Sequence, residues 1–167
     1  MAYTLLVVDD VPSVLMMIRD AMASEPYRIR TAQSGEEALK ILSREPVDVI
    51  ITDEKMPGMS GSDLLAEVRN RYPDTVRMML TGNATLASAI RAINEGEIYR
   101  FFTKPCNIVD LRVSIRQALE RKELIRENRR LSRLVKRQSD ALDVLEQQCP
   151  GITDVKRDAD GAIIIEE

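Results

Sequence analysis

The sequence predicts an α/β protein with a five-stranded parallel β-sheet and a long C-terminal helix. Short apolar runs alternate with helical patterns at intervals of roughly 20 to 30 residues, which is typical of strands joined by crossover helices. The 167 residues suffice for one domain and an appendage. The expected strands are Thr4–Val8, Tyr27–Thr31, Val47–Ile51, Val76–Leu80 and Ile98–Phe102.

Local capping signals mark the helices between these strands. Ser34 and Glu37 form a capping box ahead of an apolar helical pattern, and Ser60 opens the next helix. Asn83 can cap a fourth helix that Gly96 closes. A fifth helix can begin after Asn107, and it meets no stop signal before Pro150 and Gly151. Such a helix is too long to be covered by one small sheet.

The composition excludes several classes of protein. Histidine is absent, which rules out Ser–His–Asp triads, His-ligated zinc and self-contained phosphohistidine chemistry. Two distant cysteines, Cys106 and Cys149, make no disulfide framework, so a reduced, cytoplasmic protein is expected. The sequence has neither a signal-peptide pattern nor a membrane-spanning apolar run, and we expect no membrane partner.

The long helix carries a heptad pattern beyond residue 121. Gln138 is a polar defect at one d position, and Cys149 occupies the last a position. Asn at an a position combined with Leu at d favours two parallel strands, so a homodimer is expected. The alternative is one amphipathic helix that folds back on the domain. The expected dimer seam places Leu124, Leu131 and Leu145 at d positions and Asn128, Val135 and Leu142 at a positions.

These patterns divide the chain into three parts: a compact domain over 1–121, a coiled-coil helix over 122–149 continuous with its last helix, and an acidic tail over 150–167. The tail is interpreted either as a β-hairpin turning at Asp160-Gly161 or as a flexible segment. Residues 110–137 carry a net charge of +6. Because we expect its arginines to be spread around the helix, with glutamates among them and no aromatics, we interpret this stretch as a solvated face, and nucleic acid is not an expected partner.

Groups that can act on phosphate follow four of the five predicted strands. Asp9 and Asp10 follow the first, Asp53 the third, Thr81 the fourth and Lys104 the fifth. The carboxyl ends of parallel strands meet at one edge of the sheet, so these groups should converge. Three carboxylates repel one another unless a hard cation such as Mg²⁺ sits among them. The sequence therefore predicts a Mg²⁺ site beside a lysine and a hydroxyl that can hold an anion.

Four sequence motifs, in their order along the chain, resemble those of the CheY-like receiver domain of two-component response regulators. They are VVDD (7–10), ITDEKMPGMSG (51–61), MLTGNA (79–84) and FFTKP (101–105). The resemblance implies a flavodoxin-like sheet with strand order 2-1-3-4-5.

The resemblance also implies roles for individual residues. Asp53 would be the phosphoacceptor, and Asp9, Asp10, Asp53 and the backbone carbonyl of Lys55 would bind the metal. Thr81 and Lys104 would contact the phosphoryl group, and a cis peptide bond would precede Pro105. Thr81 would couple to an aromatic switch residue, either Phe101 or, as a competing candidate, Tyr99.

A phosphorylation-dependent regulator that acts through protein–protein interaction is the leading hypothesis. Since the chain has no histidine, its phosphoryl donor would be a separate sensor histidine kinase, and its downstream protein target is unknown. It would not be an enzyme, and would catalyse only its own phosphotransfer and dephosphorylation. The alternative is a phosphorelay intermediate that passes the phosphoryl group to a histidine phosphotransfer protein.

Overall fold

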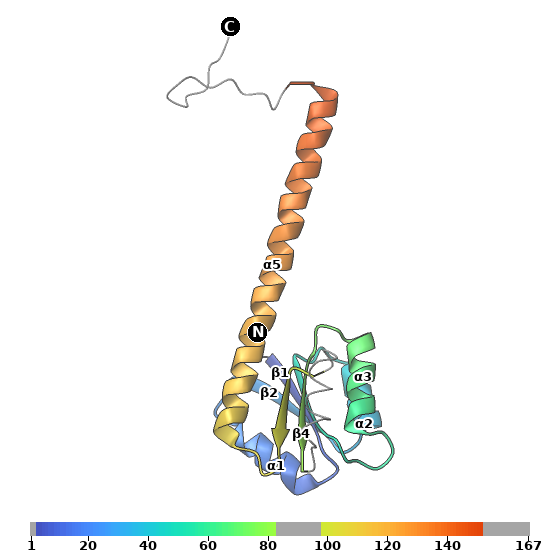
Figure 1. Cartoon of the computed structure of the whole chain (residues 1–167), viewed down its shortest axis with the longest axis vertical. Coiled ribbons are helices and arrows are strands. Elements are labelled where there is room, and N and C mark those ends of the chain that lie inside the picture. Colours follow the sequence, from blue (N-terminus) through green and yellow to red (C-terminus); the bar gives the residue numbers. More distant parts are fainter. Residues whose placement is uncertain (1–2, 83–97, 152–167) are drawn as a thin grey trace. The chain divides into compact units, whose positions relative to one another are not determined.

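A computed structural model of the chain describes residues 3–82 and 98–151 (Figure 1). The chain divides into two compact units, Met1–Lys122 and Glu123–Glu167. The expected caps Asn83 and Gly96, and the hairpin interpretation of the tail, lie outside the described residues. No helix in the described ranges is long and apolar enough to cross a membrane.

The first unit is built on a five-stranded parallel sheet. Its order, β2-β1-β3-β4-β5, confirms the order that the resemblance implied. The strands are β1 (Tyr3–Val8), β2 (Tyr27–Ala32), β3 (Val49–Asp53), β4 (Val76–Thr81) and β5 (Arg100–Thr103). The described helices are α1 (Pro12–Ala21), α2 (Gly35–Leu42), α3 (Gly61–Arg71) and α5 (Ile108–Gln148).

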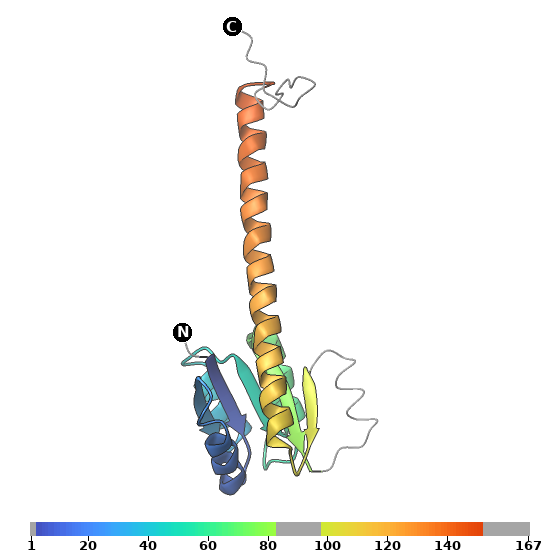
Figure 2. The same cartoon turned by 90° about the vertical axis from the view of Figure 1, so that its left-hand side faces the viewer.

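Helices cover both faces of the sheet, so alternate strand residues enter two separate cores (Figure 2). Leu5 and Val7 of β1 pack with α1 and with the first turns of α5, whereas Leu6 and Val8 pack with α2 and α3. The central strands are buried on both faces, which explains their continuous apolar sequences.

Helix starts follow the predicted caps where the structure describes them. Ser34 Oγ accepts a hydrogen bond from the N–H of Glu37 at 3.2 Å, and Ser60 Oγ accepts one from Asp63 at 3.1 Å. The side chain of Asn107 accepts from the N–H of Val109 at 2.9 Å at the start of α5. The 41 residues of α5 agree with a helix that lacks an internal stop signal.

Two strands begin later than the sequence predicted. The third strand was expected over Val47–Ile51, but β3 starts at Val49 and ends on Asp53 itself. The fifth was expected from Ile98, but β5 starts at Arg100, so Tyr99 lies before it. In both cases the apolar residues ahead of the strand are buried by packing without belonging to it, as with Val47 and Ile98.

The end of β3 lies directly against the start of α3. The N–H of Gly61 donates to the Glu54 carbonyl at 3.1 Å, and a Cβ on Gly61 would collide with the Asp53 carbonyl oxygen and with Glu54 Cα. Only a glycine allows this close approach, which positions the backbone on both sides of Asp53.

Gly61→Ala should therefore lower the free energy of unfolding, by about 1–3 kcal/mol, because the new methyl group meets backbone that cannot rotate away. Gly82→Ala is the matched control, since a Cβ there meets nothing within 4 Å among the described residues. Urea unfolding followed by circular dichroism measures both variants. Equal stability of the two would show that α3 can shift without cost.

Candidate functional site

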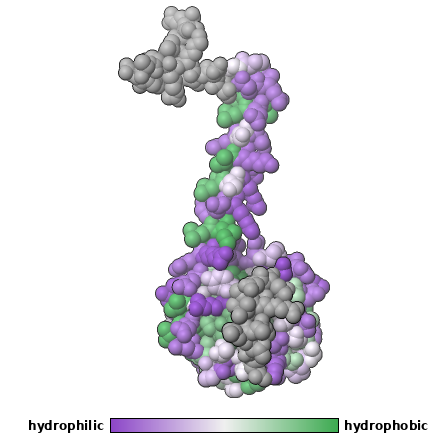
Figure 3. All heavy atoms as spheres, viewed as in Figure 1, coloured by the Kyte–Doolittle hydropathy of each residue, from purple (hydrophilic) through white to green (hydrophobic). Residues whose placement is uncertain are grey.

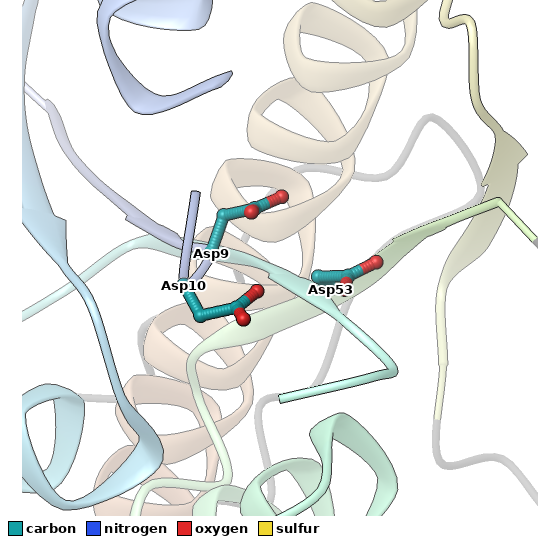
Figure 4. Close-up of side chains that lie close together, drawn as sticks. All are labelled: Asp9, Asp10 and Asp53. Atoms are coloured by element: carbon teal, nitrogen blue, oxygen red, sulfur yellow. The ribbon is translucent and has the colours of Figure 1, made fainter. Parts of the chain in front are cut away.

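Three carboxylates lie together at the carboxyl edge of the sheet (Figure 4). Asp9 and Asp10 directly follow β1, and Asp53 is the last residue of the neighbouring strand β3. One carboxylate oxygen from each lies within 4.8 Å of the other two. Asp9 is 1% exposed and Asp53 7% exposed, so two of the three charges are largely removed from water.

Lys104 supplies the positive charge of this cluster. It follows β5, and its Nζ lies 2.6 Å from Asp9 Oδ2 and 3.2 Å from Asp53 Oδ1. Burial lowers the pKa of Lys104, but its hydrogen bonds to Asp9 and Asp53 and the charges of both carboxylates outweigh burial, so the pKa is raised overall. The peptide bond between Lys104 and Pro105 is cis.

Backbone groups complete the cluster. Asp9 Oδ1 accepts from the N–H of Val11 at 2.9 Å, which holds this carboxylate at the start of α1. Thr81 ends β4, between β3 and β5, and is 2% exposed. Its carbonyl accepts from the N–H of Lys104 at 2.8 Å. The structure thus brings together Asp9, Asp10, Asp53 and Lys104, with Thr81 on the intervening strand.

The two candidate switch aromatics lie in different cores. Phe101 pairs with Met79 across the β4–β5 ladder, and both pack in the core covered by α2 and α3. Thr81 has the same strand parity as Met79 and therefore faces the same side. Tyr99 precedes β5 and packs in the opposite core, beneath α1 and α5. Tyr99 and Phe101 therefore do not share a face, although two residues at this spacing within one strand would do so.

Sequence reasoning missed the role of Glu54. Its carboxylate accepts hydrogen bonds from the N–H and hydroxyl of Ser62, at 2.9 Å and 2.8 Å, and so caps α3. These hydrogen bonds direct the Glu54 side chain, next to Asp53 in the sequence, toward α3. The side chain of Lys55 is exposed. Glu54 lies eight residues before its partner, outside the short spacings by which capping boxes are identified.

This arrangement is chemically suited to a hard cation and an anion. Three carboxylates with one ammonium group leave an excess of negative charge in a partly buried cluster. Oxygen ligands in such a cluster fit Mg²⁺, which prefers carboxylates and water. The ammonium group of Lys104 can pair with a phosphoryl oxygen, and the Asp53 carboxylate is a nucleophile toward phosphorus.

A comparison with protein families matches residues 5–116 to the response regulator receiver domain. This chain belongs to that family. It is 38% identical over 117 residues to the hydrogenase transcriptional regulatory protein HoxA of Cupriavidus necator, a match that covers 70% of this chain and 24% of HoxA. It is 36% identical over 143 residues to the transcriptional regulatory protein GlrR of Escherichia coli, covering 86% of this chain and 32% of GlrR.

Solved structures show the same fold. The signal receiver domain of an HD domain-containing protein from Pseudomonas fluorescens Pf-5 matches with a TM-score of 0.70 and 36% identity, covering 74% of this chain and 98% of that one. An adenylate cyclase structure from Rhodopirellula baltica matches with a TM-score of 0.74 and 33% identity, covering 80% of this chain and 98% of that one. Against the curated relatives HoxA and GlrR, by contrast, this chain spans only about a quarter to a third of their length.

Lys104→Met should destabilise the protein, because Asp9 and Asp53 would lose their ammonium partner in a largely buried site. A loss of about 2 kcal/mol is expected, below the 3–5 kcal/mol typical of a fully buried pair because the lysine is partly exposed. Lys40→Met, at an exposed position on α2, is the control.

The pH dependence follows from the raised pKa of Lys104. A lysine whose pKa is higher in the folded than in the unfolded state stabilises the fold fully at any pH below its unfolded-state pKa. This stabilisation is lost as the pH rises through the higher, folded-state pKa. The stability difference between wild type and Lys104→Met should therefore stay constant from neutral pH to the ordinary lysine range and decline only above it. Urea titrations in EDTA at several pH values measure this difference, and a decline near neutral pH would contradict the pairing.

Proposed function

We propose that this chain is a response regulator that accepts a phosphoryl group on Asp53 from a separate sensor histidine kinase. The observation that carries the proposal is the cluster of three carboxylates with Lys104 at the end of β3, in a chain of the receiver family. The 167 residues contain no histidine, so the donor phosphohistidine lies outside this sequence.

In the transfer, an Asp53 carboxylate oxygen forms a bond to phosphorus as the phosphorus–nitrogen bond of the donor breaks. Asp9, Asp10 and Asp53, with the backbone carbonyl of Lys55, would hold Mg²⁺, which when bound neutralises the carboxylates and phosphoryl oxygens. Lys104 pairs with Asp53 before transfer, and its ammonium group lies where it can pair with a phosphoryl oxygen afterwards.

Thr81 and Phe101 form the switch in this proposal. The Thr81 hydroxyl bonds the new phosphoryl group, and the space it leaves admits the Phe101 ring, which converts a change in charge into a change in packing. The placement of Phe101 on the same face of the sheet as Thr81 favours it over Tyr99.

We further propose that the helix beyond the receiver pairs with a second copy in a parallel coiled coil. The apolar seam residues are all exposed: Leu124 is 72% exposed, Val135 65% and Leu142 52%. Leu131 and Leu145 belong to the same stripe, and Asn128 lies on it between Leu124 and Leu131. Figure 3 shows apolar patches along this helix. Burying several such side chains contributes roughly 1.5–3 kcal/mol each, which can offset the costs of association.

The charged residues of this helix support the same pairing. Six basic side chains fall on b, c and f positions of the heptad, the side opposite the seam, and are not spread around the helix. Glutamates pair with two of them: Glu123 with Arg126 at 3.9 Å and Glu127 with Arg130 at 3.4 Å. The six are Arg126, Arg129, Arg130, Arg133, Lys136 and Arg137.

Nucleic acid is not part of this proposal. HoxA and GlrR are named transcriptional regulators, but this chain spans about a third or less of either. Asp140 and Asp143 follow the basic residues on f and b positions of the same outer side, where their charges would repel phosphates.

Phosphorylation is tested by incubating the full chain with acetyl phosphate and Mg²⁺ and measuring intact mass. One phosphoryl group should be added, and Asp53→Asn or EDTA should abolish the addition, because the nucleophile or the cation is then missing. Asp20→Asn is the control, since Asp20 lies exposed on α1. Unchanged labelling of Asp53→Asn would exclude Asp53 as the acceptor.

The dimer is tested by sedimentation equilibrium of the full chain at micromolar concentration. The double variant Leu131→Asp, Leu142→Asp should be monomeric, because carboxylates cannot be buried in the seam. Arg133→Gln with Arg137→Gln, on the outer side, should remain dimeric. A monomeric wild type, or a dimer that survives both aspartates, would rule out the seam.

Parallel register is tested through Cys149. It is exposed and occupies an a position, so mild oxidation should crosslink a parallel dimer through it, and Cys149→Ser should prevent the crosslink. Cys106 should react more slowly, because burial, followed by the charge of Asp110, raises the pKa of its thiol. A dimer that does not crosslink would indicate antiparallel pairing.

A further inference from the structure

The last receiver turn of α5 is held by two contacts that involve adjacent residues. Lys122 Nζ lies 2.8 Å from Asp48 Oδ1, and the two side chains are only 9% and 18% exposed. Next to it, the Arg121 guanidinium carbon lies 5.9 Å from the centre of the Tyr99 ring, a cation–π contact. We call these two contacts the α5 clamp.

The clamp residues Asp48 and Tyr99 precede β3 and β5, the strands whose other ends carry the phosphoryl site. Asp48 stands directly before β3, which ends in Asp53. Tyr99 stands directly before β5, which is followed by Lys104. The two strands that meet through the Lys104–Asp53 ion pair at one edge of the sheet therefore each hold α5 at the opposite edge.

Main-chain bonds make both clamp residues part of the sheet. The N–H of Asp48 donates to the Thr4 carbonyl at 2.8 Å, and its carbonyl accepts from Val76 at 2.9 Å. Its second carboxylate oxygen accepts from the N–H of Thr4 at 2.9 Å. The N–H of Tyr99 donates to the Arg77 carbonyl at 2.7 Å. Both residues are therefore tied to the start of β4, the strand that lies between β3 and β5 and ends in Thr81.

We propose that the α5 clamp transmits the state of the acidic site to the end of the receiver, with Asp48–Lys122 as the pivot and Tyr99–Arg121 as the moving contact. This inference rests on the proposed function, because it takes phosphorylation of Asp53 as the input. A phosphoryl group on Asp53 competes for Lys104 and so alters the bond between the ends of β3 and β5. β3 is bonded to a strand on each side, and the edge strand β5 is bonded to β4, so each strand moves as a unit and a relative shift reaches the clamp.

The chemistry of the two contacts separates their roles. Asp48 and Lys122 form a largely buried ion pair with a short hydrogen bond of 2.8 Å. Arg121 is exposed and Tyr99 only partly buried, so their contact can change at lower cost. A shift of β5 relative to β3 thus turns the end of the receiver helix about Lys122.

The test uses amide NMR spectra of the full chain with and without beryllofluoride and Mg²⁺, which stand in for the phosphoryl group. In wild type, amides at the acidic site and those of Arg121, Lys122 and Glu123 should all shift. In Arg121→Gln and Tyr99→Leu, the site amides should still shift, while those of residues 121–123 should shift no more than amides remote from the site. Tyr72→Leu, a partly buried tyrosine packed in the other core, is the control and should respond as wild type does.

Lys122→Met should also remove the response at residues 121–123. If it does not fold, because Asp48 is left buried without a partner, Arg121→Gln still tests the clamp at an exposed position. Shifts at the site without shifts at 121–123 in wild type, or a full response in Arg121→Gln and Tyr99→Leu, would overturn the clamp alone. Loss of the site shifts in wild type would overturn the proposed function and the clamp with it.

Discussion

Repulsion among three carboxylates is the constraint on which the site depends. Asp9 and Asp53 are almost fully buried, and a buried carboxylate is costly unless it is paired. Lys104 pairs with both, and the N–H of Val11 supplies a further hydrogen bond to Asp9. One ammonium group cannot balance three carboxylates, so the site keeps an excess of negative charge. That excess is the chemical basis of the proposed Mg²⁺ site.

The parallel sheet holds the three carboxylates together against their repulsion, because main-chain hydrogen bonds fix every strand that contributes to the cluster. Asp53 ends a strand that is buried along its whole length and paired on both sides. Gly61 allows α3 to approach the Asp53 backbone, and Glu54 is bonded to that helix. The carboxylates therefore remain close together although their charges oppose it. The proposed α5 clamp depends on this rigidity, because a small change at this edge would then reach the opposite edge.

Helix α5 changes its role along its length. Before residue 123 its apolar side chains, such as Leu111 and Ile115, are fully buried in the core with α1. After residue 123 its apolar side chains are exposed, among them Ile125 and Leu134, which flank the heptad seam. A helix with an apolar stripe is stable in water when that stripe is covered. The adjacent residues Arg121 and Lys122 mark the end of the part that the sheet holds.

The sequence by itself determined the alternation of strands and helices, the caps at Ser34 and Ser60, and the acidic and basic groups at the strand ends. These features depend on local backbone chemistry and on the period of apolar residues, which can be read within a short window. The resemblance supplied the strand order. Apolar runs could not show where a strand begins, because buried residues such as Val47 can precede it, and so Asp53 fell outside the predicted strand.

Only the tertiary structure decided which distant residues meet. Tyr99 and Phe101, two residues apart, enter opposite cores because the chain joins the sheet between them. Asp48 was a charged residue within an apolar run, a signal of a buried partner, but nothing local identifies Lys122, 74 residues away. Such contacts depend on how the helices pack across the sheet, and that packing is a property of the whole chain.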